Sequence, residues 1–127
     1  METHKDLRVW RQSVELVTSL YVMTKTFPKD ELFGLVSQIR RAAVSVPSNI
    51  AEGYARGTDK EKLHFLRISS GSLSEVETQL LLSLNLGYIA QDTHDALSES
   101  LTAVWKQLNA LISSLKKRVS LQEGIPC

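Results

Sequence analysis

Three histidines and the carboxylates near them are the side chains of this chain best suited to bind a metal. Glu61 and His64 have the Glu-x-x-His spacing by which four-helix bundles hold a pair of irons, because residues three apart lie on one face of a helix. That chemistry needs a second copy of the motif, which the chain lacks. His4 lies near the N-terminus and His94 at the start of the last predicted helix. We therefore expect no metal and no cofactor, and we interpret His64 as a surface residue.

Nucleophilic catalysis has no motif to support it. The sequence contains neither a Gly-x-Ser-x-Gly elbow nor a phosphate-binding P-loop. The single cysteine, Cys127, is the last residue, which predicts a free terminal thiol and excludes an internal disulfide. We expect Glu52, Glu75 and Glu77 to form structural ion pairs across helices, with Arg40, Arg41 or Arg67, rather than to act as general acids or bases. The sequence indicates a protein that is not an enzyme.

Basic side chains offer a third kind of chemistry, the binding of phosphate, for which the forked guanidinium of arginine is well suited. The candidates lie on the first three predicted helices and are Arg8, Arg11, Arg40, Arg56, Lys60, Lys62 and Arg67. Acidic residues are interleaved with them, and the whole chain has a net charge of only +1, so composition alone does not indicate a nucleic-acid-binding protein. Solvated helix faces with local ion pairs explain the same residues equally well.

Four helices are predicted to position these side chains within a single domain of residues 1–127. Apolar residues recur every three or four positions over about 7–26, 29–56, 59–86 and 93–120, and residues 121–127 form a tail. No strand-like alternation occurs, so the fold class is all-α. Asp6, Asp92 and Thr58 (the last in a capping box with Glu61) are predicted N-caps, while Gly57 and Gly87 are predicted to end helices.

The second predicted helix contains Pro47, which removes an amide donor and clashes with the Ala43 carbonyl. We expect a kink there, with the Ser45 and Ser48 hydroxyls satisfying freed backbone groups. Arg40 and Arg41 point about 100° apart on a helix. Arg41 shares a polar stripe with Glu52, so we expect Arg41 to be structural and Arg40 to be free for a ligand.

Wide apolar arcs on the first and third predicted helices indicate contact with a second subunit. The first helix carries two stripes, where a lone bundle needs one: Leu7, Trp10, Val14, Val17 and Tyr21, and then Val9, Leu16, Leu20 and Met23. On the third helix, Ile68 and Leu82 lie well away from the inner face, and Gly71 among serines lets a partner helix come close. The structural or interface candidates are Trp10, Tyr21, Arg41, Pro47, Asn49, Glu52, Gly71 and Glu75.

Short motifs along the chain resemble the four-helix bundle proteins encoded in intervening sequences of bacterial 23S ribosomal RNA genes. They are Phe27-Pro28, Glu31, Phe33-Gly34-Leu35, Gln38, Arg40-Arg41-Ala42, Asn49 to Gly53, Phe65-Leu66, Gly71-Ser72-Leu73, Glu75 and Leu86-Gly87-Tyr88. The resemblance implies an antiparallel up-down four-helix bundle, a ring-shaped homopentamer and nucleic-acid binding. The accessory variability protein of diversity-generating retroelements, which works with a reverse transcriptase, is distantly similar in fold.

Together these patterns predict a non-catalytic, oligomeric bundle that binds RNA or DNA through a basic surface. The alternative is an adaptor or scaffold ring that binds a partner protein and makes no direct contact with nucleic acid. The charged N-terminus does not look like a signal peptide, and no apolar run is long enough for a membrane span, so we expect a cytoplasmic, bacterial protein.

Overall fold

The computed structural model describes residues 3–124, and within them the chain is helical, with no strand. The four long helices are α1 (Arg8–Thr24), α2 (Leu35–Arg56), α3 (Asp59–Asn85) and α4 (Gln91–Gln122). Two short 3-10 helices, η1 (His4–Asp6) and η2 (Lys29–Glu31), precede α1 and α2. The all-α prediction is confirmed, whereas the prediction of a free thiol at Cys127 falls on a residue outside the described range.

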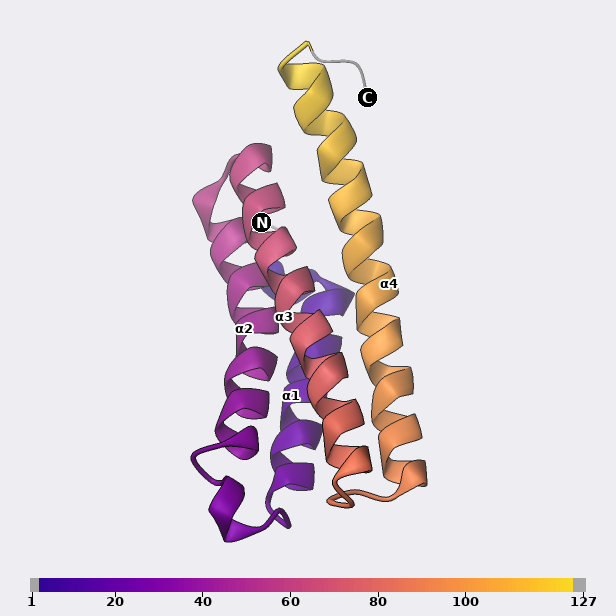
Figure 1. Cartoon of the computed structure of the whole chain (residues 1–127). Coiled ribbons are helices and arrows are strands. Elements are labelled where there is room, and N and C mark those ends of the chain that lie inside the picture. The colour runs from indigo at the N-terminus through magenta and orange to yellow at the C-terminus, as the bar shows by residue number, and fades with distance from the viewer. Residues whose placement is uncertain (1–2, 125–127) are drawn as a thin grey trace.

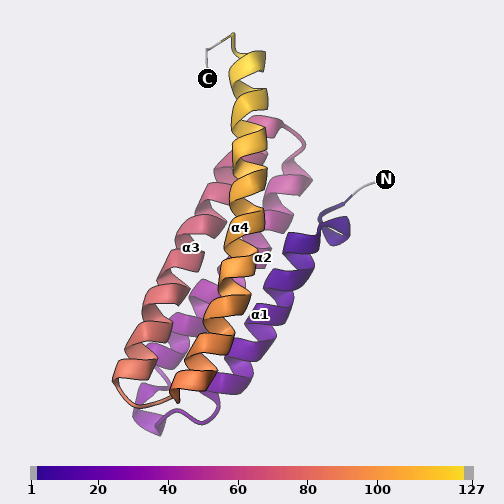
Figure 2. The ribbon, with the colours of Figure 1, turned by 90° about the vertical axis from the view of Figure 1, so that its right-hand side faces the viewer.

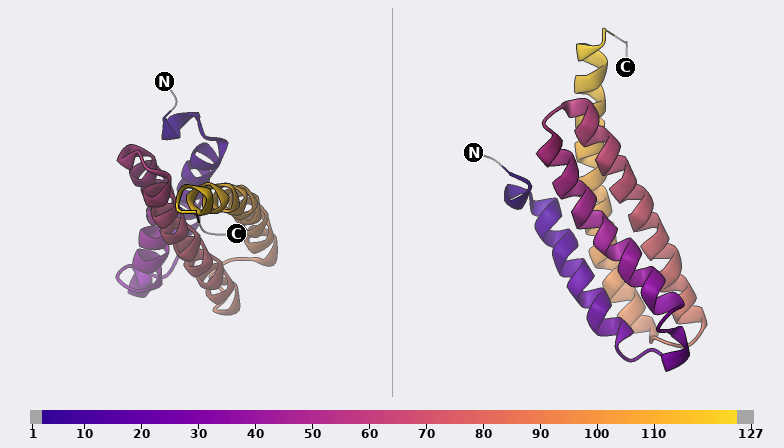
Figure 3. Two further views of the ribbon diagram at one scale, coloured as in Figure 1. Left: turned by 90° about the horizontal axis from the view of Figure 1, so that it is seen from above. Right: turned by 90° about the vertical axis from the view of Figure 1, so that its left-hand side faces the viewer.

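The four helices pack as a bundle in which each contacts two others (Figure 1). Both α1 and α3 contact α2 and α4, which places α1 and α3 at opposite corners. Figure 2 shows α4 nearest the viewer, between α3 and α1, and the right-hand view of Figure 3 shows α2 between the same two helices from the other side. The α1–α2 and α3–α4 connections lie at one end, the lower end in Figure 1, and the α2–α3 connection lies at the other. The last turns of α4 extend beyond that connection.

Helix ends follow the predicted signals in some places and not in others. Thr58 accepts a hydrogen bond from the Glu61 amide (3.2 Å) and donates its hydroxyl to the Glu61 carboxylate (2.9 Å), as a capping residue should. Gly57 and Gly87 take the left-handed conformation, with φ of 92° and 77°, where a Cβ would be strained.

The predicted caps at Asp6 and Asp92 are wrong. Asp6 lies in η1, where its carboxylate accepts from the Thr3 amide, and α1 begins after Leu7 without a side-chain cap. Asp92 lies in the first turn of α4, because that helix already begins at Gln91. Its carboxylate accepts from the neighbouring Thr93 amide instead.

The second helix begins at Leu35, later than predicted, because Glu31 holds the preceding turn. One carboxylate oxygen of Glu31 accepts from the Leu35 amide (3.4 Å) and the other accepts from the Tyr88 hydroxyl (2.8 Å). The Tyr88 ring also packs on buried Phe27, with centroids 5.2 Å apart. These contacts join the two connections at one end of the bundle. They also raise the pKa of Tyr88, through the hydrogen bond to Glu31, burial and the carboxylate charge, in that order.

One of the two predicted stripes of α1 forms the core and the other is only partly covered. Val9, Leu16, Leu20 and Met23 are buried. Of the second stripe, Leu7, Trp10 and Val17 pack at the edge of the core, while Val14 and Tyr21 are each 37% exposed. Apolar residues of 29–56 that recur every three or four positions form the buried face of α2 from Leu35 to Ile50, and Tyr54 is half-buried. Leu32 lies outside the helix and is exposed.

Close contact between α2 and α3 occurs at Gly53 and not at Gly71. A Cβ on Gly53 would lie 3.0 Å from the Phe65 Cβ, whereas a Cβ on Gly71 would meet open space. The helix runs unbroken through Pro47, and the predicted kink there stays a prediction. Hydroxyls from α3 serve this region: Ser69 donates to the Val46 carbonyl (2.8 Å). The Ser48 hydroxyl, which was predicted to satisfy a freed backbone group, is exposed and makes no hydrogen bond to the backbone among the described residues.

Within residues 3–124, no helix is long and apolar enough to cross a membrane.

Candidate nucleic-acid interface

Cations lie on aromatic rings where α2 ends and α3 begins. The Lys62 ammonium lies 5.0 Å from the centre of the Tyr54 ring, and the Arg56 guanidinium lies 5.4 Å from the centre of the Phe65 ring. Both cations are thereby held at the surface over flat apolar groups. Together with Arg67, which is exposed on the next turn of α3, these five residues form what we call the basic aromatic end.

Several charges at this end are already paired. Arg56 forms an ion pair with Glu52 (2.8 Å), Lys60 with Glu123 (3.3 Å), and Arg118 with Asp59 (2.9 Å). Within the described chain, Lys62 and Arg67 have no carboxylate partner. Those two cations therefore carry the free positive charge of the basic aromatic end.

The two adjacent arginines of α2 have the reverse of the predicted arrangement. Arg40 donates through Nε to the Thr24 hydroxyl (3.0 Å) and through Nη2 to the Tyr21 carbonyl (3.4 Å), and its guanidinium lies 4.5 Å from the centre of the Tyr21 ring. Arg40 therefore fastens α2 to α1. Arg41 is exposed and has no ion pair within residues 3–124, because its expected partner Glu52 bonds Arg56. The ion pairs expected of Glu75 and Glu77 are likewise absent from the described residues.

The remaining two basic candidates lie at the start of α1. Arg11 donates to the Lys5 carbonyl (3.1 Å), which fixes the turn before the helix, and Arg8 is exposed. Trp10, on the same turns, is half-buried and packs its ring edge-on against His4, with centroids 5.0 Å apart. This contact leaves Trp10 as a packing residue rather than an open platform for a base.

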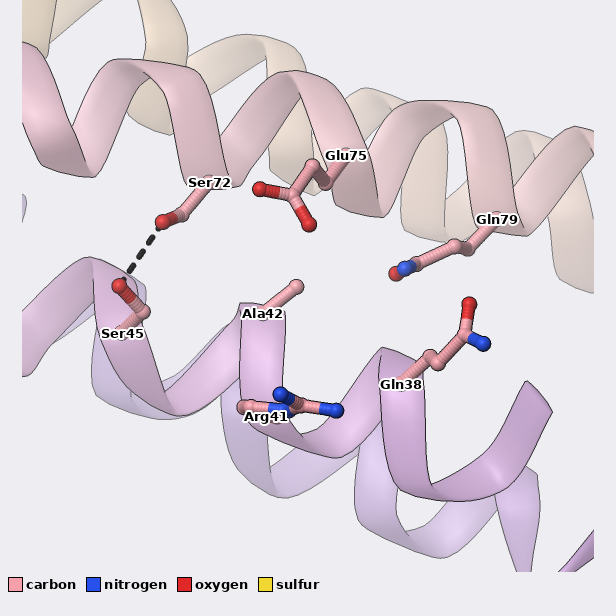
Figure 4. A pocket seen from close by; sticks show the side chains of 7 residues that line it. All are labelled: Gln38, Arg41, Ala42, Ser45, Ser72, Glu75 and Gln79. Carbon is pink, nitrogen blue, oxygen red and sulfur yellow. Dashed lines mark hydrogen bonds between the residues drawn. The ribbon is translucent and has the colours of Figure 1, made fainter. Parts of the chain in front are cut away.

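A polar pocket of about 360 Å³ lies between α2 and α3 (Figure 4). Its lining residues are Gln38, Arg41, Ala42, Ser45, Ser72, Glu75 and Gln79. Ser45 and Ser72 close one end by a hydrogen bond of 2.8 Å between their hydroxyls. Asn49, one turn beyond, supports Ser45 by donating to its carbonyl (2.8 Å) and its hydroxyl (2.9 Å).

Gln79 is the pocket residue that sequence reasoning missed. It is only 8% exposed, and its Oε1 is buried without a hydrogen-bond partner in the described chain. Its position in the helical period could have identified it from the sequence. Buried positions of α3 include Leu73, Val76, Leu80 and Ser83, so an amide at 79 stands on the inner face, where an apolar residue is usual.

An apolar groove of about 530 Å³ lies on the neighbouring side of α2, towards α1. It is lined by Tyr21, Leu32, Phe33, Val36, Ser37, Arg40, Arg41 and Val44. Phe33 is 93% exposed and Leu32 is 50% exposed. Such exposure of large apolar side chains side by side is typical of a surface that binds another protein.

The described part of the chain contains no cluster of potential metal ligands. Among residues 3–124, no three histidine, cysteine or acidic side chains lie together. His64 packs against Phe65, and His94 bonds Asp95 (3.1 Å). The contact with His94, and a second bond from Gln91, lower the pKa of Asp95 at the exposed start of α4.

Comparison with known proteins agrees with this fold. A solved protein of unknown function from the S23 ribosomal protein family of Bacteroides thetaiotaomicron is 22% identical, with a TM-score of 0.74, over 82% of this chain and 97% of that one. At that identity the likeness shows the fold alone. No curated protein matches the chain significantly. The sequence profile of the 23S rRNA-intervening sequence proteins matches residues 5–110, and the chain therefore belongs to the 23S rRNA-intervening sequence protein family.

Proposed function

We propose that this protein is a non-catalytic, cytoplasmic RNA-binding protein that works as a ring-shaped homo-oligomer. The observation that carries the proposal is the basic aromatic end, where Lys62 and Arg56 lie on the rings of Tyr54 and Phe65, and where Arg67, further along α3, is exposed without an ion pair among the described residues. Single-stranded nucleic acid is commonly bound by cations that meet phosphates and by planar groups on which bases stack. The family's association with ribosomal RNA genes, given in its name, supports RNA over DNA as the ligand.

The positive charge is confined to the basic aromatic end and is not spread over the whole surface, which is consistent with a chain whose net charge is only +1. The carboxylates nearby are largely engaged, because Asp59 accepts from Arg118 (2.9 Å) and Gln122 (2.8 Å) and Glu61 accepts from Thr58 (2.9 Å). Because Arg118 balances the charge of Asp59, that carboxylate repels a phosphate less than a free carboxylate would. In a ring, the same small patch recurs with the symmetry and becomes a band.

The ring itself is supported by two unlike apolar surfaces on one antiparallel up-down bundle. Tyr21, Leu32, Phe33 and Val44 are exposed on the α1–α2 side, while Ile68, Leu81, Leu82 and Leu86 are exposed on or just after α3. Because α1 and α3 occupy opposite corners, these surfaces face different directions. Head-to-tail contact between two unlike surfaces generates a closed ring when the rotation closes. A pentamer is the stoichiometry that the family resemblance implies.

The apolar groove also supports a second candidate, an adaptor that binds a partner protein. Phe33 at 93% exposure is the specific observation in its favour. A ring that used its α3 surface alone for assembly would leave this groove open to a partner. The two candidates differ in whether RNA binds directly.

The test is a filter-binding titration of single-stranded RNA at several salt concentrations. Combined Lys62→Ala and Arg67→Ala substitution is expected to reduce the slope of log affinity against log salt by about two, since each lost phosphate contact removes about one. The control is Lys25→Ala with Lys29→Ala, which removes the same charge near the α1–α2 connection, at the other end of the bundle. Equal losses in both variants, or no salt-dependent binding by the unmodified protein, would leave the adaptor as the better account.

A further inference from the structure

The pocket between α2 and α3 contains an unmet need for a hydrogen-bond donor. Gln79 Oε1 is buried and has no partner among the described residues, a condition that costs free energy in a folded protein. Figure 4 shows Gln79 and Glu75 extending from α3 towards α2, with Gln38 opposite Gln79. Rotation of the Gln79 amide about its last side-chain bond turns this oxygen into the pocket, where a group that donates to it would remove the deficit.

The two helices that line the pocket offer opposite hydrogen-bonding groups. On α3, the Glu75 carboxylate can only accept hydrogen bonds, and the orphaned Gln79 oxygen lies one helical turn away on the same face. On α2, the Arg41 guanidinium can only donate, through a planar fork, and it has no intramolecular partner within residues 3–124. A ligand that matches has neighbouring donors along one edge and neighbouring acceptors along another.

We propose that this pocket binds the guanine base of a single-stranded RNA. The N1–H and exocyclic N2–H2 of guanine are adjacent donors suited to Glu75 and Gln79. The O6 and N7 of guanine are adjacent acceptors, the arrangement that arginine bonds in bidentate fashion. Adenine has only one exocyclic donor group, and uracil has a single N–H on its pairing edge. Unpaired bases are read in this way, along their exposed edges.

Space and position agree with a single base. A volume of about 360 Å³ falls at the lower end of the range of roughly 300–1,000 Å³ typical of ligand pockets. The small side chains of Ala42, Ser45 and Ser72 leave that space open between the helices. The proposal rests on the RNA-binding function above and adds to it a preference for sequence, because phosphate contacts position a strand and base contacts specify it.

The direct test compares guanosine and adenosine monophosphates, which share a phosphate and differ in the base. Calorimetry on the unmodified protein is expected to show about tenfold or greater preference for the guanine nucleotide, the scale of one bidentate base contact. Glu75→Gln and Gln79→Leu are each expected to reduce guanine binding to the adenine level. Glu77→Gln, an exposed change outside the pocket on the same helix, is the matched control and is expected to leave the preference intact.

Loss of binding in Gln79→Leu cannot be attributed to unfolding of the variant. Gln79→Leu replaces a buried, unbonded oxygen with apolar atoms of similar volume, so its melting temperature is expected to rise. Equal binding of the two nucleotides, or an unchanged preference in Gln79→Leu, overturns the proposal. A fall in oligomer mass for Gln79→Leu, without nucleotide binding by the unmodified protein, also overturns it and identifies the pocket as a contact between copies.

Binding of an RNA strand without guanine tests the general RNA-binding function apart from the pocket proposal. If a guanine-free strand and a guanine-rich strand bind with the same affinity and salt slope, the pocket proposal fails while RNA binding stands. If no strand binds at any salt concentration, both proposals fail together. Tighter binding of the guanine-rich strand that Gln79→Leu abolishes, with the salt slope unchanged, supports both.

Discussion

At the scale of single residues, Arg40 and Arg41 show how adjacent, chemically identical side chains take different roles. The bonds from Arg40 to Thr24 and the Tyr21 carbonyl tie α2 to α1, while Arg41 extends between the polar pocket and the apolar groove, both of which it lines. Sequence reasoning separated the two correctly, by about 100° around the helix. It assigned the roles the wrong way round because Glu52, the partner assumed for Arg41, is bonded by Arg56 four residues along the same helix.

Arg40→Ala is therefore expected to lower the free energy of unfolding by about 1–2 kcal/mol, through the lost charged hydrogen bonds and the contact with the Tyr21 ring. Arg41→Ala is expected to change it by less than about 0.5 kcal/mol, as is usual for an exposed side chain. Urea denaturation of both variants measures the difference. Equal losses in the two variants would contradict the assignment of Arg40 as the fastening residue.

Tyr88 provides a test by pH. Its folded pKa lies above the ordinary value because the hydroxyl donates to Glu31. The folded protein then holds this proton at pH values where the unfolded chain releases it, so the stabilisation is complete below the ordinary tyrosine pKa, about 10, and is lost as pH rises through the folded pKa. Tyr88→Phe should lower the melting temperature near neutral pH and converge on the unmodified protein at high pH. Thermal melts of both proteins between pH 7 and pH 11 measure this change. A difference in melting temperature that stays constant across that range would show that the hydrogen bond to Glu31 is not what stabilises the protein.

At the scale of helices, the packing of α2 on α3 is set by glycine in one place and by serines in another. Gly53 allows α3 to approach to where a Cβ would lie 3.3 Å from the Lys62 Cα. Ser69 and Ser72 bond α2 through the Val46 carbonyl and Ser45. Gly71, between those serines, faces open space. Close approach of α2 and α3 within the subunit therefore depends on Gly53, and the role predicted for Gly71 towards a partner helix stays a prediction.

Gly53→Ala and Gly71→Ala form a matched pair. The first is expected to destabilise the protein, because the added methyl group meets α3 backbone and the Phe65 Cβ, and to weaken RNA binding by displacing Lys62 and Phe65. The second is expected to stabilise it by up to roughly 1 kcal/mol, the difference in helix propensity between the two residues. Chemical denaturation measures both. Stabilisation by Gly53→Ala would contradict this, because it would show that α3 can move away from the added methyl group without loss of packing energy.

The sequence predicts the helices well and the site poorly, for physical reasons visible at particular residues. Helix formation depends on local period and caps, and so the apolar series through α2 and the capping by Thr58 are confirmed. The start of α2 depends on Glu31 meeting Tyr88, which is 57 residues away, and no local rule contains that bond. The pocket likewise exists only because Arg41 on α2 and Gln79 on α3 line the same space.

At the scale of the whole molecule, the apolar groove around Phe33 makes assembly testable. Light scattering on the unmodified protein is expected to give a mass several times 14.2 kDa. Phe33→Glu places a charge on a side chain that is 93% exposed, so it should dissociate the oligomer without unfolding the protomer. Leu121→Glu is the control, because Leu121 is 78% exposed near the end of α4 and outside the groove. An unchanged mass for Phe33→Glu would show that the groove is not a contact between copies of the chain.

The contact of Tyr88 with Phe27 and Glu31 has a consequence for how the protein opens. It clasps the two connections that flank the α2–α3 pair, and those two helices share the most extensive contact in the bundle. The bond between Glu31 and Tyr88 thus closes the segment from 31 to 88 into a loop, against which α1 and α4 pack to complete the core. In native-state hydrogen exchange, cooperative units of this kind open last. Amides of α2 and α3 should therefore exchange only by global unfolding, whereas those of α1 and the projecting turns of α4 exchange by partial opening that leaves the central pair intact.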